Sequence, residues 1–231
     1  MKKTLSLAAT LFLVACGAVP GCNTDIGDGP PSAAASRPAQ PIDCSVVLYG
    51  DSIMHGGYVD GTETKRHARH LSAELKAQRP AWTVDDRTVS GQSLAKMSKI
   101  FYKETRSARV VVLGSGIAEA WSGGDVKAQL AQLVHDVRDE GRVPILTGYA
   151  RQVPNGFMTP ERLAGRDRAD ADVAALAEEL DVTFADFGAA GPVEIIDDVH
   201  PTQAYSLRIT EQLIRALDKA APECNNAALA Q

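Results

Sequence analysis

The chain has 231 residues, of which 45% are hydrophobic and 23% are charged, an ordinary composition for a globular domain. Its length suits one folded domain once the N-terminal segment is set aside. The formal net charge of −5 offers no basic surface for phosphate groups, so the composition argues against a nucleic-acid partner.

The N-terminal segment, residues 1–15, predicts a signal peptide. Lys2 and Lys3 precede an apolar run of about ten residues, which is too short to cross a bilayer as a helix. The run ends in the letters LVAC and resembles the lipobox of bacterial lipoproteins, in which the cysteine, here Cys16, receives the lipid. We therefore expect export to the cell envelope and contact with the membrane through a lipid anchor only. The alternative is plain secretion with a free Cys16.

Residues 16–41 are rich in Gly, Pro, Ala and Ser and predict a flexible tether that follows the lipidated cysteine. Such a segment cannot bury enough apolar surface to offset the entropy of its chain. The folded domain is expected over residues 42–222, with a short C-terminal tail over 223–231. We expect the protein to be a monomer.

Strands and helices are predicted to alternate along the domain. In chain order, the predicted elements are strand 45–49, helix 64–79, strand 82–89, helix 93–105, strand 109–113, helix 125–140, strand 144–147, helix 161–180, strand 182–187 and helix 203–220. Most of the strands are short, apolar and β-branched without alternation, which indicates burial on both faces and a parallel sheet. The strand 82–89 is less apolar and is expected nearer an edge of the sheet. The expected fold is a three-layer α/β/α sandwich with a mainly parallel five-stranded sheet, flavodoxin-like. Functional sites in such sheets lie at the carboxyl ends of the strands.

Two further cysteines bracket this domain. Cys44 stands just before the first predicted strand, and Cys224 follows the last predicted helix. Export would place both in a compartment that permits disulfides. We therefore predict a disulfide between them, worth roughly 4 kcal/mol in the chain-entropy model. The alternative is a pair of unrelated thiols.

Two short segments carry groups suited to nucleophilic catalysis. Ser52 follows the first predicted strand after a tight turn, where a helix N-terminus would leave its backbone N–H free to donate. A plain helix cap is the alternative role for this serine. About 150 residues later, Asp197 precedes His200 by three residues, so a turn could place the carboxylate on the imidazole. A serine needs such a base to become nucleophilic at neutral pH, and a histidine has a suitable pKa.

Together, Gly50-Asp51-Ser52 and Asp197-x-x-His200-Pro201 resemble the first and last sequence blocks of the SGNH hydrolases, also called GDSL-type esterases and lipases. The resemblance implies a serine hydrolase that acts on ester bonds through an acyl-enzyme and needs neither a metal nor another cofactor. It assigns Ser52 as the nucleophile, His200 as the base and Asp197 as the residue that orients the base. Asp198 is the alternative acid. Substrates would be small-molecule or carbohydrate-borne esters.

The resemblance is incomplete at the oxyanion hole. The family uses the N–H of the nucleophile, here Ser52, and that of a glycine matched by Gly91. It also uses an Asn side chain, in whose place this chain has Gly116. Losing one side-chain donor can cost roughly 10²–10³ in turnover. Another group, such as Ser115 or Gln92, could replace the Asn, the enzyme could be slow, or the domain could bind its ligand without turnover.

Other residues carry weaker signals. Trp121 and Tyr149 follow predicted strands and could line a substrate pocket, or simply pack within loops. His67 and His70 lie three residues apart on a predicted helix, but without further ligands nearby they favour an exposed polar face over a metal site. Two alternatives to ester hydrolysis remain open: acyl transfer to envelope sugars, and a catalytically weak surface-binding lipoprotein.

Overall fold

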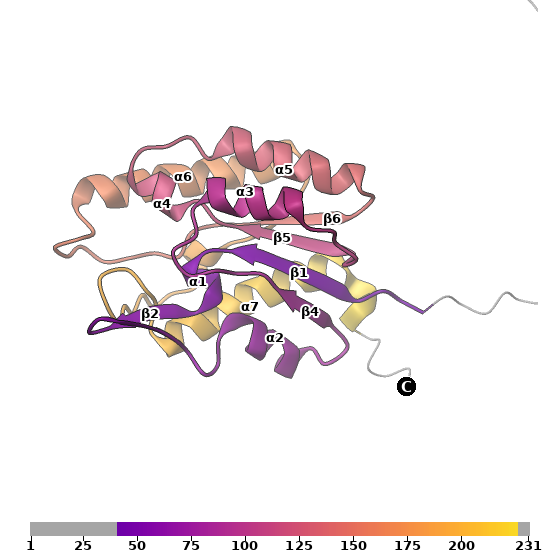
Figure 1. Cartoon of the computed structure of the whole chain (residues 1–231), viewed down its shortest axis with the longest axis horizontal. Coiled ribbons are helices and arrows are strands. Elements are labelled where there is room, and N and C mark those ends of the chain that lie inside the picture. The colour runs from indigo at the N-terminus through magenta and orange to yellow at the C-terminus, as the bar shows by residue number, and fades with distance from the viewer. Residues whose placement is uncertain (1–40, 226–231) are drawn as a thin grey trace, which may run out of the picture. The chain divides into compact units, whose positions relative to one another are not determined.

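The computed structural model describes residues 41–225, so the predicted signal peptide, Cys16 and nearly all of the tether lie outside the described residues. A five-stranded, all-parallel sheet forms the centre of the domain in the order β4-β1-β5-β6-β7 (Figure 1). The strands are β1 (Ser45–Gly50), β4 (Thr83–Asp86), β5 (Val110–Gly114), β6 (Val143–Thr147) and β7 (Thr183–Ala185). This is the flavodoxin-like strand order, and it confirms the predicted fold class.

Helices cover both faces of the sheet (Figure 1). The helices on one face are α2 (Leu71–Gln78) and α7 (Gln203–Ala220), and those on the other are α3 (Leu94–Lys103), α4 (Ile117–Trp121), α5 (Lys127–Asp139) and α6 (Pro160–Glu179). The apolar runs of β1 and β5 are fully buried between these layers, which explains why their sequences lack polar alternation. None of the helices described in residues 41–225 is long and apolar enough to cross a membrane.

A small hairpin replaces the first half of one predicted helix. The helix expected over 64–79 is wrong before residue 71, because β2 (Gly57–Asp60) and β3 (Glu63–Arg66) pair as antiparallel strands. Gly61 makes the turn with a φ of 64°, a conformation that favours glycine. His70 only caps α2, and His67 lies before it, so the two histidines do not share a helix face.

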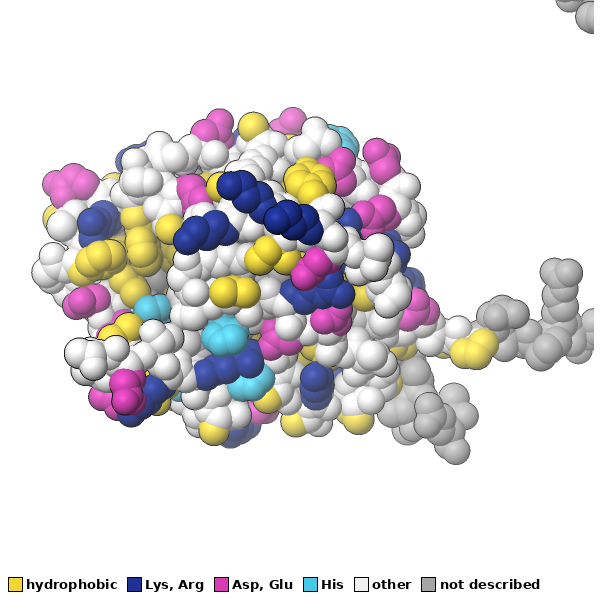
Figure 2. Space-filling model, in the orientation of Figure 1, with side chains coloured by type: hydrophobic (Ala, Val, Ile, Leu, Met, Phe, Trp, Pro, Cys, Tyr) yellow, Lys and Arg dark blue, Asp and Glu magenta, His cyan; other side chains and the backbone are white. Residues whose placement is uncertain are grey.

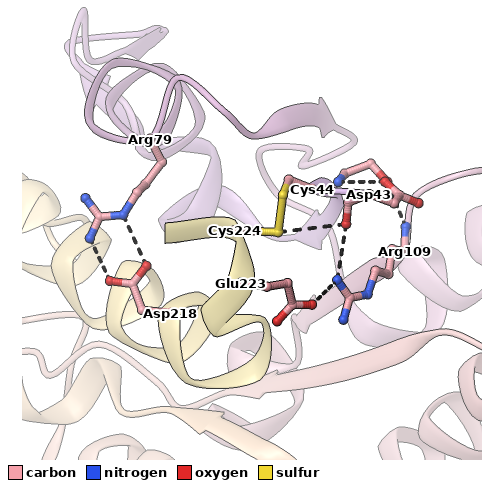
Figure 3. The surroundings of a disulfide bond; sticks show 8 residues. Asp43, Cys44, Arg79, Arg109, Asp218, Glu223 and Cys224 are labelled. Carbon is pink, nitrogen blue, oxygen red and sulfur yellow. Dashed lines mark hydrogen bonds and ion pairs between the residues drawn. A yellow bond between two sulfur atoms is a disulfide. The ribbon is translucent and has the colours of Figure 1, made fainter. Parts of the chain in front are cut away.

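The predicted disulfide between Cys44 and Cys224 is present and joins the start of β1 to the 3-10 helix Pro222–Asn225 (Figure 3). The bond closes a loop with a sequence separation of 180 residues, for which the chain-entropy model gives about 5 kcal/mol, slightly more than the roughly 4 kcal/mol expected from the sequence. Two ion pairs flank it: Arg109 contacts Glu223, and Arg79 donates to both carboxylate oxygens of Asp218 at 2.6 and 3.1 Å. The two ends of the domain are therefore linked at the start of β1, at the opposite end of this strand from Ser52.

Candidate active site

Ser52 lies at the carboxyl end of the central strand. β1 ends at Gly50, and the short helix α1 (Ser52–His55) begins two residues later. Asp51 caps this helix, with its Oδ1 accepting a hydrogen bond from the Ile53 N–H at 3.0 Å. Gly50 is required by packing, because a Cβ there would lie 2.5 Å from the sulfur of Met54. This turn places Ser52 in the first turn of a helix, where backbone N–H groups have no intrahelical acceptor.

The serine, the histidine and the aspartate predicted from the sequence come together in a hydrogen-bonded chain. Ser52 Oγ lies 2.9 Å from His200 Nε2, although the two residues are 148 positions apart. On the other side of the ring, His200 Nδ1 lies 2.7 Å from Asp197 Oδ2. Since a carboxylate accepts the Nδ1 proton, Nε2 is left to accept the proton of the serine.

The Asp197 carboxylate is held by the loop that it belongs to. Its Oδ1 accepts from the N–H groups of Val199 and His200, both at 2.8 Å, and its Oδ2 also accepts from the N–H of Val59 at 2.8 Å. Burial raises the pKa of Asp197, but these hydrogen bonds outweigh burial and bring the pKa below its ordinary value. Asp198, the alternative acid, is exposed and does not contact the imidazole.

The position of the expected oxyanion-hole Asn has a backbone that favours glycine. Gly116 has a φ of 124°, and a Cβ built on it would lie 2.7 Å from the Tyr149 hydroxyl and 3.1 Å from a methyl carbon of Val126. An Asn side chain therefore cannot enter here without displacing its neighbours. Gly91 also has a positive φ, 71°, at the turn after β4. The hydroxyl of Ser115, a suggested substitute, donates instead to the carbonyl of Gln92 at 3.4 Å.

Residues 48–205, more than half of the chain, match the model of the GDSL-like lipase/acylhydrolase family. The chain belongs to this family. It shows no significant match to the curated proteins. The match runs from β1 to the start of α7 and so contains the whole Ser52–His200–Asp197 chain of hydrogen bonds.

Solved structures share the fold of this GDSL-family chain at low sequence identity. An aryl esterase from M. smegmatis has a TM-score of 0.66 at 15% identity, covering 76% of this chain and 99% of its own. A carbohydrate acetylesterase from Sinorhizobium meliloti has a TM-score of 0.65 at 14% identity, covering 77% and 98%. A variant of an acetyl-xylooligosaccharide esterase from Geobacillus has a TM-score of 0.59 at 20% identity, covering 75% and 93%.

Beneath Ser52, this GDSL-family chain buries several polar groups. Asp51 and Tyr149 line a cavity of about 10 Å³, which has room for roughly one water molecule. Burial raises the pKa of Asp51 to about 7, although backbone N–H groups of Ile53 and Met54 partly oppose it. Burial also raises the pKa of Tyr149 far above its ordinary value, so the phenol stays protonated. Among residues 41–225, no group accepts or donates a hydrogen bond at the Tyr149 hydroxyl.

An apolar pocket opens beside His200. It has a volume of about 200 Å³ and is lined by Val59, Phe157, Asp197, Asp198, Val199 and His200. Two residues, Trp121 and Tyr149, are predicted from the sequence to line a pocket. Trp121 is not part of this lining, but it packs against Phe157 in a T-shaped pair with the ring centroids 5.5 Å apart. Tyr149 is buried and lines the small cavity beneath Ser52 instead. The sequence analysis did not predict Val59 or Val199 as pocket residues.

No group of three or more His, Cys, Asp or Glu side chains suited to hold a metal ion occurs in the described part of the chain. His67 is buried, and its Nε2 lies 2.9 Å from the carbonyl oxygen of Pro201, the residue after His200. Tyr58 stacks on the His67 ring at 4.7 Å. Through this hydrogen bond and this stacking contact, His67 connects the hairpin to the loop that carries His200.

Proposed function

We propose that this protein is a serine esterase that hydrolyses carboxylic esters through an acyl-enzyme on Ser52. The observation that carries the proposal is the chain of contacts from Ser52 Oγ to His200 Nε2 and from His200 Nδ1 to Asp197, at 2.9 and 2.7 Å. Membership of the GDSL-like family supports the reaction class. Solved structures described as an aryl esterase and as carbohydrate acetylesterases have the same fold, which is compatible with either substrate class.

The reaction would proceed in two halves around one histidine. Ser52 Oγ attacks the ester carbonyl carbon while His200 Nε2 takes its proton, and the resulting oxyanion accepts hydrogen bonds from backbone N–H groups. We assign these donors to Ser52 and Gly91, with Gly116 beside them. His200 then gives its proton to the leaving alcohol oxygen as the carbon–oxygen bond breaks. Water next attacks the acyl-enzyme with His200 again as base, which releases the acid and restores the serine.

Asp197 remains ionised throughout this cycle. Its lowered pKa favours the carboxylate, and its hydrogen bonds to the backbone fix its direction. A carboxylate in this position holds the tautomer of His200 and stabilises the imidazolium that forms in each half.

The test is a fluorophosphonate probe together with p-nitrophenyl acetate, applied to the wild type and to Ser52→Ala. We expect the wild type to become labelled at Ser52 and the variant to lose both labelling and turnover, by roughly 10⁴-fold or more. The exposed serine Ser122, at the end of α4, provides the matched control in Ser122→Ala, which should behave as the wild type. Wild-type protein that neither labels nor exceeds Ser52→Ala would overturn the proposal. Turnover that requires an added sugar acceptor would instead indicate an acyltransferase.

We further propose that the enzyme is exported and anchored by a lipid on Cys16. The disulfide between Cys44 and Cys224 supports an oxidising compartment, since such bonds rarely persist in the cytosol. Growth of expressing cells with a labelled fatty acid should label the full chain and leave Cys16→Ser unlabelled. Equal labelling of the two proteins would exclude this anchor.

A further inference from the structure

We propose that the apolar pocket beside His200 binds the alcohol part of the ester and makes the enzyme select apolar alcohols, an aromatic ring or a short alkyl chain, over sugars. This proposal rests on the proposed esterase function. Hydrophobic side chains gather on the surface at the end of the domain where the β2–β3 hairpin and the loop before α6 lie (Figure 2). Val59 and Phe157 are 44% and 38% exposed there.

The position of the pocket identifies which half of the ester it receives. His200 must place its Nε2 proton on the leaving oxygen, so that oxygen has to lie within hydrogen-bond distance of the ring. The pocket is lined by His200 itself and by Val199, the residue before it. The lining includes neither Ser52 nor Gly91, so the pocket lies on the base side of the nucleophile and away from the assigned oxyanion donors. The base side is where the alcohol part of the ester leaves.

The lining favours an apolar occupant. Both oxygens of Asp197 already accept hydrogen bonds, and both nitrogens of His200 belong to the catalytic chain of contacts. Asp198 is then the remaining charged side chain of this lining. A sugar would have to give up water from several hydroxyl groups for too few partners, at a cost of roughly 1–3 kcal/mol for each unpaired group. A benzyl group or a short alkyl chain meets no such cost against Val59 and Phe157.

The size and rigidity of the pocket also restrict the occupant. A volume of about 200 Å³ lies below the range typical of drug-sized ligands and suits one ring or a short chain. The side chain of Asn155 holds the Phe157 loop, since its Oδ1 accepts from the N–H of Phe157 at 2.8 Å and its Nδ2 donates to the Asp198 carbonyl at 2.7 Å. On the opposite wall, the Val59 N–H donates to Asp197. Both walls are therefore hydrogen-bonded to the catalytic loop, so the pocket is pre-organised.

The test compares three acetates of alcohols with similarly poor leaving groups: benzyl acetate, methyl acetate and 6-O-acetylglucose. Because the acyl group is constant and the leaving groups are alike, differences in kcat/KM report binding of the alcohol part. We expect kcat/KM to be at least about tenfold higher for benzyl acetate than for either of the others. Equal values, or a preference for the sugar acetate, would overturn the proposal.

Two variants connect the preference to the pocket. Phe157→Ala should lower kcat/KM for benzyl acetate about tenfold and leave methyl acetate within about threefold, and Val59→Thr should act in the same direction with its shape conserved. The control is Tyr102→Ala, since Tyr102 is an aromatic residue of α3 that is 58% exposed and absent from the pocket lining. A uniform loss for all three esters in Phe157→Ala would contradict an alcohol pocket. Fluorophosphonate labelling of Ser52 separates the two proposals, because labelled protein without the preference refutes the pocket alone.

Discussion

Two carboxyl groups flank Ser52, and their surroundings shift their pKa values in opposite directions. Asp197 accepts hydrogen bonds from three backbone N–H groups and from His200, and its pKa lies below its ordinary value. Asp51 is fully buried beneath the serine, and burial raises its pKa to about 7. The hydrogen bonds thus stabilise one carboxylate as an ion, whereas burial favours the protonated form of the other.

The surroundings of the two carboxyl groups differ in the same way. On the His200 side, each polar atom of the catalytic chain of contacts has a partner. On the Asp51 side, within the described range 41–225, the Tyr149 hydroxyl, the Gln92 side-chain amide and Glu119 Oε2 are buried without a hydrogen-bond partner. The first side therefore surrounds an ionised carboxylate with hydrogen-bond donors. The second side, around Gly116, contains buried polar atoms that have no hydrogen-bond partner. The contacts that proton transfer from Ser52 would need are therefore complete, whereas the oxyanion side has Gly116 in place of the expected Asn.

The largest effect is expected from Asp197→Asn. The amide would keep the size of the side chain but would donate toward Nδ1, so His200 would carry its proton on Nε2 and could not accept the serine proton. We expect kcat for p-nitrophenyl acetate to fall about 10⁴-fold with the fold preserved. Asp198→Asn is the control, because Asp198 is exposed and does not contact the ring. A comparable loss in Asp198→Asn would show that the acid has been assigned to the wrong residue.

The second prediction concerns Asp51 and the pH dependence of stability. Because the folded-state pKa of about 7 lies above the ordinary 3.8, the folded protein retains a proton that the unfolded chain releases between these values. The stabilisation from this group is fully present below pH 3.8 and is lost as pH rises through 7. The loss is on the order of 4 kcal/mol.

Asp51→Asn removes this titration and retains an oxygen that can accept from the Ile53 N–H. Urea denaturation at pH 4.5 and pH 8 would measure the free energy of unfolding of both proteins. We expect the wild type to lose stability relative to the variant as the pH rises. Parallel pH profiles for the two proteins would show that Asp51 titrates as an ordinary surface carboxyl.

The sequence predicts the sheet and the hydrogen-bonded trio of Ser52, His200 and Asp197 better than it predicts their surroundings. Residues 46–49 and 110–113, within the predicted strands 45–49 and 109–113, are all apolar because both faces of a parallel sheet are covered. The local composition therefore indicates their burial. The hairpin was missed because the strand Glu63–Arg66 is entirely polar and mostly exposed, and its polar residues are compatible with a solvated helix. Pocket residues such as Val199 are single apolar positions in loops, and the sequence pattern around them does not distinguish them from other loop residues.

A third prediction concerns the missing Asn. Adding it as Gly116→Asn should fail to raise turnover, because a φ of 124° strains any residue with a side chain and the new Cβ would meet the Tyr149 hydroxyl. We expect the free energy of unfolding to fall by about 1–3 kcal/mol and kcat to fall about tenfold or more. Gly141→Asn is the matched control, since Gly141 has a φ of 72° and nothing lies within 4 Å of a Cβ there. An increase in kcat would show that the loop can relax and that the hole is merely incomplete.

The smallest expected effect comes from Tyr149→Phe, which tests whether the unpaired Tyr149 hydroxyl takes part in catalysis. The substitution keeps the ring in place and removes a buried hydroxyl that makes no hydrogen bond to any residue between 41 and 225. Removing such a group spares its desolvation, so the free energy of unfolding should rise by about 1 kcal/mol while kcat stays within about threefold of the wild type. A fall in kcat of about 10²-fold or more without a loss of stability would have the opposite meaning. The Tyr149 phenol, kept protonated by its raised pKa and placed where a side chain at position 116 would lie, would then be the donor that replaces the Asn.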